Sequence, residues 1–352
     1  MTETNQFYIK RCLQIAKNGT SLAMPNPSVG AVVVFHGKII GEGFTSKFGG
    51  NHAEVNAIKA VKDIASLKQA TLYVTLEPCS HFGKTPPCVN LIIKHQFKKV
   101  VIGCLDSNSL VAGKGVAALK NAGIEVVVGV LEKECLQHHQ RFLLSQEKKR
   151  PYIILKWAET KNGFIAPLHQ EKQAPVFISN QYSQQLVHKM RSEVQAILVG
   201  TNTVLKDNPR LNVRTWSGNS PIRVVIDRDL KISDEAAVLD GSETTIIFYA
   251  DSCTKKVPLN STLNKKYVAI DFTENLAAAI CQALQKNQIQ SIIIEGGAQT
   301  LQTFIDENLW DEAVVFTGEN EFLSGIKAPI FNKTFDQEIS IKNDILKKYT
   351  ND

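Results

Sequence analysis

The stretch that decides the fold is Thr75-Leu-Glu-Pro-Cys-Ser-His-Phe-Gly-Lys-Thr-Pro-Pro-Cys88, read together with His52-Ala-Glu54 a little upstream. One imidazole, two cysteines and a nearby glutamate are the groups that a catalytic zinc ion needs. Zn²⁺ takes nitrogen and sulfur ligands in a tetrahedral array, and a catalytic site leaves the fourth position to water. We therefore expect His52, Cys79 and Cys88 to hold one zinc ion and Glu54 to transfer protons beside it.

The spacing of these residues is close to the H-x-E…P-C-x-x-C pattern of zinc-dependent deaminases. It departs from the short form of that pattern, because eight residues separate Cys79 from Cys88. The alternative is a closed structural zinc site with His81 as the fourth ligand. Structural sites usually pair their cysteines at short spacing, and Glu54 would have no role in one. The residues therefore favour a catalytic metal.

Length and composition describe an ordinary globular protein. The chain has 352 residues, 43% hydrophobic and 21% charged, which is comfortable for two domains. No stretch approaches the roughly 20 apolar residues of a membrane span, and the first residues lack an apolar signal segment. We therefore expect a cytoplasmic protein. Away from the motif, five scattered cysteines have apolar neighbours and should be buried as small hydrophobes: Cys12, Cys104, Cys135, Cys253 and Cys281.

The charge is uneven along the chain. Residues 1–150 carry 19 Lys and Arg against 10 Asp and Glu, whereas the remainder carries 21 against 24. A basic half could bind nucleic acid or a phosphorylated small molecule. However, no dense Lys/Arg run with interleaved aromatics is present, so scattered surface lysines are an equally good reading.

Hydrophobic periodicity predicts an α/β layer fold in each half. In the first half, β-branched runs alternate with helical patterns. We expect helices at 7–18, 53–62, 87–95, 113–122 and 131–145, and strands at 31–35, 38–45, 70–75, 98–104 and 124–128.

The charge-rich run Glu147-Lys-Lys-Arg-Pro151 predicts the domain boundary, because Pro151 disfavours helix at the residue before it. A second α/β unit without repeat of the first should follow, with polar loops at 166–175 and 251–265. Its expected strands are 152–158, 194–200, 221–227, 244–249, 267–271, 289–295 and 311–316, and its helices 180–191, 274–286 and 298–306.

Four segments of the first half resemble the bifunctional deaminase–reductase family of riboflavin biosynthesis: 25–34 (PNPSVGAVVV), 52–54, 75–88 and 106–113 (DSNSLVAG). The longer cysteine spacing is the rule in that family. The resemblance implies a cytidine-deaminase-like domain at 1–150, which removes ammonia from a diaminopyrimidinone carrying a phosphoribosylamino group. It also implies a substrate pocket lined by Asn26, His81, Lys84, Asp106 and Asn108, with Lys84 suited to the phosphate. His81 then becomes a substrate contact in place of a fourth ligand.

The second half is similar to the reductase domain of the same family in segments 155–158 (LKWA), 197–204 (ILVGTNTV), 207–214 (DNPRLNVR) and 295–297 (EGG). That resemblance implies a dihydrofolate-reductase-like α/β domain at 151–352, which uses NADPH to reduce the ribosyl group to ribityl. Carried over by position, NADPH would contact Ala158, Phe177, Thr203, Asp207 and Gly297. The substrate would contact Lys156, Arg191, Leu211, Arg214 and Glu295, the arginines at its phosphate and Lys156 and Glu295 near the reacting carbon.

The chain departs from the family pattern in a few places. Thr160-Lys-Asn-Gly163 replaces the usual Ser-Leu-Asp-Gly, Pro175 replaces a serine, Phe177 replaces a tryptophan, and the run at 317–325 is altered. The alternative function is a nucleic-acid base deaminase with an accessory domain, since the same zinc pattern serves that chemistry. The reductase half argues against it. We expect a phosphorylated pyrimidine as substrate, no nucleic-acid or membrane partner, and a homo-oligomer.

Overall fold

The computed structural model describes residues 3–83, 86–107, 113–170, 172–255, 257, 264–273 and 275–351. The chain divides into two compact units, residues 1–149 and 150–352. The division falls one residue before the expected boundary, because Arg150 belongs to the second unit. Its guanidinium donates two hydrogen bonds to the carboxylate of Asp311, at 2.6 and 2.7 Å.

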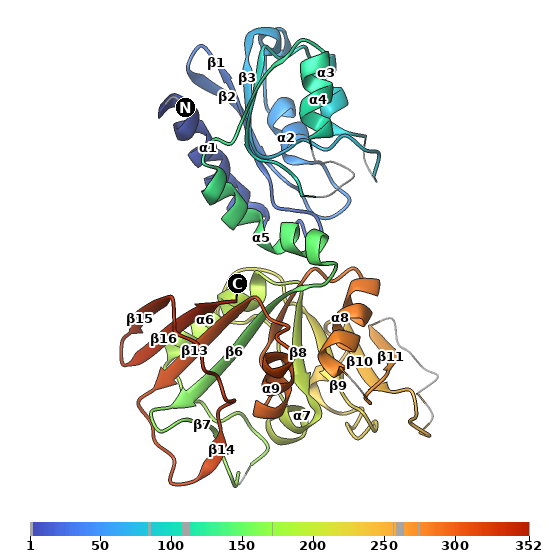
Figure 1. Cartoon of the computed structure of the whole chain (residues 1–352), viewed down its shortest axis with the longest axis vertical. Helices are drawn as coiled ribbons and strands as arrows, with labels where there is room; N and C mark the ends of the chain where they lie inside the picture. Colours follow the sequence, from blue (N-terminus) through green and yellow to red (C-terminus); the bar gives the residue numbers. More distant parts are fainter. Residues whose placement is uncertain are drawn as a thin grey trace. The chain divides into compact units, whose positions relative to one another are not determined.

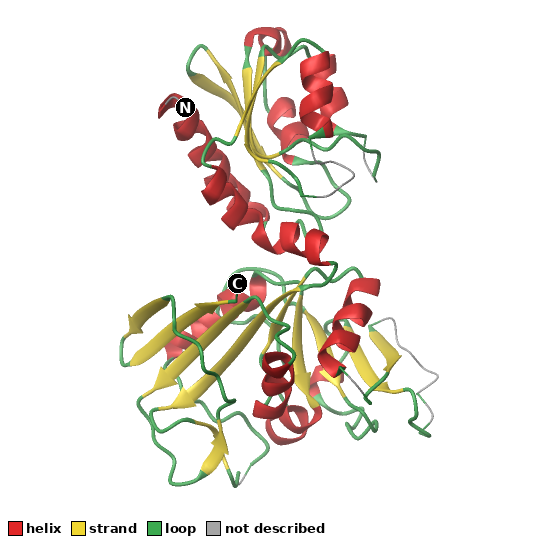
Figure 2. Cartoon of the chain, in the orientation of Figure 1, coloured by secondary structure: helices red, strands yellow, loops and turns green. Residues whose placement is uncertain are grey.

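The first unit is a five-stranded sheet between two layers of helices (Figure 1, Figure 2). The strand order is β2-β1-β3-β4-β5, with β1 antiparallel to both neighbours and β3, β4 and β5 parallel. Helices α1 and α5 cover one face, and α2, α3 and α4 cover the other. The elements are β1 (Gly30–Phe35), β2 (Lys38–Phe44), β3 (Thr71–Leu76), β4 (Lys99–Cys104), β5 (Glu125–Val128), α1 (Glu3–Ala16), α2 (Ala53–Lys59), α3 (Cys88–Lys94), α4 (Lys114–Asn121) and α5 (Glu132–Lys148).

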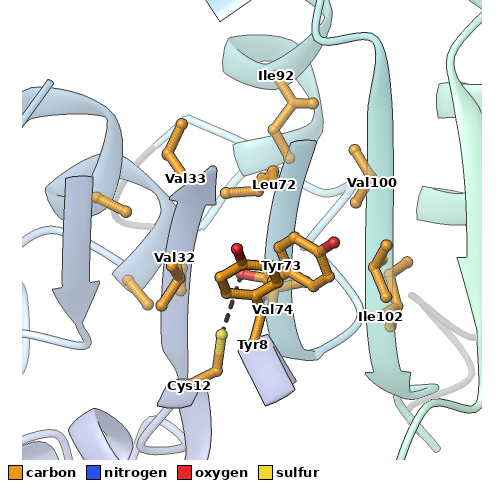
Figure 3. Packing of buried hydrophobic residues seen from close by; sticks show 14 of the residues in the cluster. Tyr8, Cys12, Val32, Val33, Leu72, Tyr73, Val74, Ile92, Val100 and Ile102 are labelled. Atoms are coloured by element: carbon orange, nitrogen blue, oxygen red, sulfur yellow. Dashed lines mark hydrogen bonds between the residues drawn. The ribbon is translucent and has the colours of Figure 1, made fainter. Parts of the chain in front are cut away.

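The central strands of this unit are apolar on both faces because helices cover both faces. Helix α1 packs on β1 and β3, where Tyr8, Cys12 and Tyr73 lie together (Figure 3). The ring centroids of Tyr8 and Tyr73 are 4.8 Å apart, and the thiol of Cys12 donates to the Tyr73 carbonyl at 3.4 Å. Gly30 permits this contact, because a Cβ there would stand 2.0 Å from the carbonyl oxygen of Cys12. This close contact between α1 and Gly30 fixes where β1 begins. The segment 25–29, which precedes β1, is thereby held in place.

The second unit is built on a nine-stranded sheet of order β11-β10-β9-β8-β12-β6-β13-β16-β15. All pairs are parallel except those that join β13, β16 and β15, which are antiparallel. Helices α8 and α9 lie on one face and α6 on the other (Figure 1). The elements are β6 (Tyr152–Thr160), β7 (Phe164–Pro167), β8 (Ala196–Gly200), β9 (Ile222–Ile226), β10 (Thr245–Ala250), β11 (Lys265–Ile270), β12 (Ser291–Ile294), β13 (Glu312–Gly318), β14 (Gly325–Lys327), β15 (Gln337–Ile341), β16 (Asp344–Thr350), α6 (Gln181–Ser192), α7 (Thr201–Asp207), α8 (Leu276–Lys286) and α9 (Ala298–Asp306).

Some elements were not expected from the sequence. Helix α7 buries only Val204, so it carries almost no apolar periodicity. Strands β7, β14, β15 and β16 are short or polar, and β7 takes up the start of the expected loop at 166–175. Among the scattered cysteines, Cys253 is half-buried rather than buried. No helix within the described part of the chain is long and apolar enough to cross a membrane.

Asp311 joins the start of the second unit to its sheet, which gives a stability prediction. Its carboxylate also accepts the backbone N–H of Ile153 at 2.8 Å, and its side chain is 3% exposed. The substitution Asp311→Ala would leave a largely enclosed guanidinium, with 12% of its side chain exposed, and a buried N–H without this acceptor, so we expect a loss of about 3–5 kcal/mol in unfolding free energy. All three tryptophans (157, 216 and 310) lie in this unit, so their fluorescence in a denaturant titration reports on it.

The matched control for that experiment is Asp229→Ala. Asp229 pairs with Lys231 at 2.9 Å, but both side chains are exposed to solvent. Such a pair contributes little to stability. The denaturation midpoint of this variant should stay near that of the parent protein, and equal effects of the two substitutions would contradict the role given to Asp311.

Candidate active sites

The three expected zinc ligands meet at the carboxyl end of β3. His52 caps the start of α2, Cys79 lies in the loop after β3, and Cys88 begins α3. The Nδ1 atom of His52 lies 3.5 Å from the Cys79 sulfur and 3.3 Å from the Cys88 sulfur. The ligand atoms all lie within 4.8 Å of one another. Two sulfurs and one imidazole nitrogen at these distances fit a zinc ion, with one position left for a further ligand.

A hydrogen bond between the two thiols of this cluster moves their pKa values in opposite directions. The hydrogen bond from Cys88 lowers the pKa of Cys79 to about 4, with a further contribution from His52, while the pKa of Cys88 rises. The backbone N–H of Cys88 also donates to the Cys79 sulfur at 3.4 Å. Cys79 is thus the sulfur that gives up its proton more readily. A divalent cation would take the place of the thiol protons and hold both sulfurs as thiolates.

Glu54 lies in the first turn of α2, two residues after His52, and is only 3% exposed. Burial, together with the negative charge of Cys79, raises the pKa of its carboxyl to about 7, although His52 acts the other way. A cation held by the three ligands would lower this pKa by its own charge. Glu54 is therefore a buried carboxyl group whose hold on a proton depends on the charge of its neighbours.

Three of the expected deaminase substrate residues, Asn26, His81 and Asp106, lie near the same edge of the sheet. Asn26 lies just before β1, whose first residue donates to Thr75 Oγ1 at 3.2 Å, and Asp106 follows β4. Asn26 is half-buried, Asp106 is buried and His81 is exposed. Within the described chain, the metal-ligand cluster contains His52, Cys79 and Cys88 and does not include His81. Lys84 and Asn108, also expected here, lie outside the described residues.

Glu77 supports the loop that carries Asp106, a role that the sequence did not suggest. Its carboxylate is buried and accepts three backbone N–H groups, those of Asp106 at 3.4 Å, Gly113 at 3.0 Å and Val116 at 3.1 Å. A charged acceptor satisfied by three donors fixes the segments on both sides of that loop. Its position in Leu76-Glu-Pro-Cys79 was the available signal, but no local pattern showed which N–H groups it binds.

Two histidines of α5 also contact the edge of the sheet where the metal-ligand cluster lies. His138 Nε2 lies 2.8 Å from the Ser28 carbonyl oxygen, and His139 Nε2 lies 3.0 Å from Thr75 Oγ1. Burial lowers the pKa of both imidazoles, which keeps them neutral at pH 7. They tie α5 to the segment before β1 and to the end of β3. The sequence places them on a helix but does not say what they contact.

The second unit contains a cavity of about 860 Å³ at the carboxyl ends of its parallel strands. All ten residues expected at the reductase site line this cavity. Five were expected to contact the cofactor and five the substrate: Ala158, Phe177, Thr203, Asp207 and Gly297, and Lys156, Arg191, Leu211, Arg214 and Glu295. The structure thus brings together residues that are up to 141 positions apart in the chain.

Three charged side chains that line the cavity form a buried cluster: Lys156, Arg191 and Glu295. Arg191 donates two hydrogen bonds to Glu295, at 2.8 and 2.7 Å, and Lys156 Nζ lies 3.8 Å from Glu295 Oε2. Burial acts to raise the pKa of Glu295, but the positive charges of Arg191 and Lys156 outweigh it, and the pKa falls to about 2. Burial lowers the pKa of Lys156. The guanidinium of Arg191 is thus engaged by Glu295, which leaves Arg214 as the more available arginine.

The turn at Glu295-Gly-Gly297 needs glycine for steric reasons. A Cβ on Gly296 would stand 2.5 Å from the Cα of Val199, and Gly297 has a φ of +40°. These glycines allow the end of β12 to lie against β8 at the start of α9. Basic side chains that the sequence analysis did not select also line the cavity: Lys206, Arg210 and Arg228. Arg210 lies within the 207–214 segment that carries the resemblance, where it had no expected role, and Lys206 and Arg228 lie outside the resembling segments.

The departures from the family pattern lie in different places. Thr160 and Asn162 close the turn between β6 and β7, where Thr160 Oγ1 donates to Asn162 Oδ1 at 2.7 Å and accepts the N–H of Phe164 at 3.0 Å. Asn162 Nδ2 also donates to the Phe322 carbonyl at 2.8 Å. The altered segment therefore forms a hydrogen-bonded turn. Pro175 and Phe177, in contrast, line the cavity itself.

Fold and sites together define a zinc-dependent deaminase joined to a reductase. The model of the cytidine and deoxycytidylate deaminase zinc-binding region matches residues 2–104, and that of the RibD C-terminal domain matches residues 151–318. The riboflavin biosynthesis protein RibD of Aquifex aeolicus is 41% identical over 316 residues, which are 89% of this chain and 86% of that protein. RibD of Bacillus amyloliquefaciens is 37% identical over 310 residues, 87% of this chain and 82% of that one.

Solved structures agree over the whole length. RibD of Acinetobacter baumannii matches with a TM-score of 0.87 at 33% identity, over 99% of both chains. A Thermotoga maritima protein, described as a diaminohydroxyphosphoribosylaminopyrimidine deaminase and 5-amino-6-(5-phosphoribosylamino)uracil reductase, matches with a TM-score of 0.87 at 34% identity, again over 99% of both. The chain belongs to the RibD family of bifunctional riboflavin-biosynthesis enzymes. The expected fold, with a deaminase-like and a reductase domain, is confirmed.

The thiolate ligands give a prediction about metal content. We expect Cys79→Ser to lower zinc affinity by at least tenfold, because a hydroxyl is a much weaker zinc ligand than a thiolate. Zinc per chain can be measured by inductively coupled plasma mass spectrometry after dialysis. Cys253→Ser is the matched control, since Cys253 is a half-buried thiol away from the cluster. Equal zinc in the Cys79→Ser variant and the parent would rule out this ligand set.

Proposed function

We propose that the two units act in sequence on one phosphorylated pyrimidine. The first would remove ammonia from a diaminopyrimidinone that carries a phosphoribosylamino group, and the second would reduce the ribosyl group of the product to ribityl with NADPH. One observation carries the proposal: a single chain holds both a Cys–Cys–His cluster beside a buried glutamate and a separate cavity with a buried Arg–Glu–Lys cluster.

In the deaminase unit, His52, Cys79 and Cys88 hold the zinc ion, and Glu54 handles protons. When bound, zinc supplies an activated water. Glu54 would pass the two protons of the attacking water, one to the ring nitrogen and one to the amino group, so that N=C–NH₂ and H₂O become HN–C=O and NH₃. Burial of Glu54 suits this role, because the carboxyl gains and loses its proton easily. Asn26, His81, Lys84, Asp106 and Asn108 are proposed to orient the pyrimidine and its phosphate.

In the reductase unit, the bound cofactor supplies a hydride to C1′ of the opened sugar. Ala158, Phe177, Thr203, Asp207 and Gly297 are proposed to hold the cofactor. Lys156 and Glu295 lie beside each other in the same cavity and would orient the sugar and stabilise charge that develops at C1′. Arg214 would bind the phosphate, and Leu211 would pack against the substrate. Arg191 would hold Glu295 in place and contribute its positive charge.

We also propose a cellular compartment for the enzyme. Zinc held by two thiolates suits a reducing compartment, and the cytoplasm is the compartment that we propose. A homo-oligomer, and the absence of nucleic-acid or membrane partners, remain predictions. Ammonia release from RNA or single-stranded DNA, with none from the free pyrimidine, would favour the alternative nucleic-acid deaminase.

Glu54→Gln separates the two activities. The amide cannot carry protons, so ammonia release should fall by roughly 10²–10⁴-fold, while the three zinc ligands remain. NADPH oxidation on substrate that is already deaminated should continue at the parental rate. Ammonia is measured by a coupled assay and NADPH by absorbance, both on the full chain.

The control for this variant is its zinc content, which should equal that of the parent protein. Loss of both activities would show that the halves do not work independently. Undiminished ammonia release with zinc retained would remove Glu54 from the mechanism.

Arg214→Ala tests the other site. Loss of a charge-assisted contact to phosphate should raise the KM for the deaminated substrate by about tenfold or more, with ammonia release from the first substrate unchanged. Steady-state NADPH oxidation at varied substrate gives the KM. Arg228→Ala is a comparison variant, because Arg228 lines the same cavity but was not expected at the substrate. If Arg214→Ala leaves the KM unaltered, the phosphate is bound elsewhere.

A further inference from the structure

The segment that carries Arg214 into the cavity, residues 208–214, has an unusual backbone. Asn208 and Leu211 have φ values of +41° and +57°, in the left-handed region that residues other than glycine rarely adopt. Backbone of this kind persists only where the surroundings hold it. Side chains from outside the segment must therefore fix its course along the cavity.

Helix α6 supplies two such contacts from one face. Arg214 donates its backbone N–H to Nδ1 of His188 at 3.2 Å, and Arg191 Nη1 donates to the carbonyl of Asn212 at 3.3 Å. His188 and Arg191 are three residues apart on the helix, so their side chains lie on the same side of it. His188 also lines the cavity. The guanidinium of Arg214 is supported separately, by Asn212 Oδ1 at 2.5 Å.

The surroundings of His188 favour its neutral form, in which Nδ1 can accept a hydrogen bond. Its side chain is buried, with 6% exposed. Burial, together with the positive charges of Arg191 and Arg214, lowers its pKa to about 4, while Glu295 and the Asn212 backbone act the other way. A neutral imidazole with Nδ1 unprotonated can accept the Arg214 N–H, whereas an imidazolium could not.

We propose that His188 is a positioning residue for the reduction: by accepting the backbone N–H of Arg214, it sets where the Arg214 guanidinium enters the cavity and so how well the substrate's phosphate is bound. This inference rests on the proposed function, because the role of Arg214 at the phosphate is part of that proposal. His188 touches neither reactant in this role and acts through the backbone of Arg214.

Three substitutions test the acceptor. Asparagine places its side-chain oxygen near the position of Nδ1, glutamine places its amide near Nε2, and leucine offers no acceptor. We expect His188→Leu and His188→Gln to raise the KM for the deaminated substrate by about tenfold, with kcat changed much less. His188→Asn should restore the KM to within about threefold of the parent value. The KM for NADPH and the rate of ammonia release should not change.

A purely structural role would give a different pattern. The KM values for substrate and NADPH would rise together, or His188→Asn would be as poor as His188→Leu, and either result overturns the proposal. Tryptophan fluorescence checks the fold of this unit in each variant, since all three tryptophans belong to it. If His188→Leu does not fold, the comparison of His188→Asn with His188→Gln decides.

Combination with Arg214→Ala distinguishes this inference from the proposed function. If His188 acts through Arg214, adding His188→Leu to Arg214→Ala should raise the KM little further. A raised KM in Arg214→Ala together with an unchanged KM in His188→Leu would overturn the inference and leave the proposed function standing. An unchanged KM in Arg214→Ala would remove the phosphate role of Arg214 and the inference with it.

Discussion

The carboxyl ends of parallel strands gather at one edge of a sheet, and both halves of this protein depend on that constraint. In the first unit, β3 and β4 run side by side, so the loops with Cys79 and Asp106 leave the sheet together. In the second unit, Gly200 ends β8, Glu295 follows β12, and Lys156 lies in β6 directly after the last residue paired with β12, so all three line one cavity. Neither site could form if one of these strands were shifted along its neighbour.

The two buried glutamates, Glu54 and Glu295, have opposite pKa shifts because their neighbours differ in charge. Glu54 lies beside Cys79 and Cys88, and burial is the largest influence on its carboxyl. The pKa of that carboxyl is therefore raised to about 7. Glu295 is equally enclosed but lies between Arg191 and Lys156, and it stays ionised, with a pKa of about 2. The first carboxyl is suited to moving a proton, and the second to holding a fixed negative charge.

The sequence predicted the parts of the fold that carry strong apolar periodicity. It also predicted that His52, Cys79 and Cys88 come together, because their chemistry is visible in one short motif. Residues of the reductase cavity came from resemblance, since no local pattern links Lys156 to Glu295. Contacts made by single polar side chains over long distances were missed: Glu77 with the N–H groups around Asp106, and His188 with Arg214. Periodicity reports burial, and it does not report the partner of a buried donor or acceptor.

Gly296 has a consequence for how this family can diverge. Its Cα hydrogens face the backbone of β8, and any side chain would collide with Val199 whether or not the cavity performs chemistry. A descendant that had lost reduction would be free to change Glu295, but it would still have to keep Gly296 in order to fold. The presence of Gly296 in a relative therefore indicates only that the fold is kept. The presence of Glu295 is the better indicator that the reductase activity is kept.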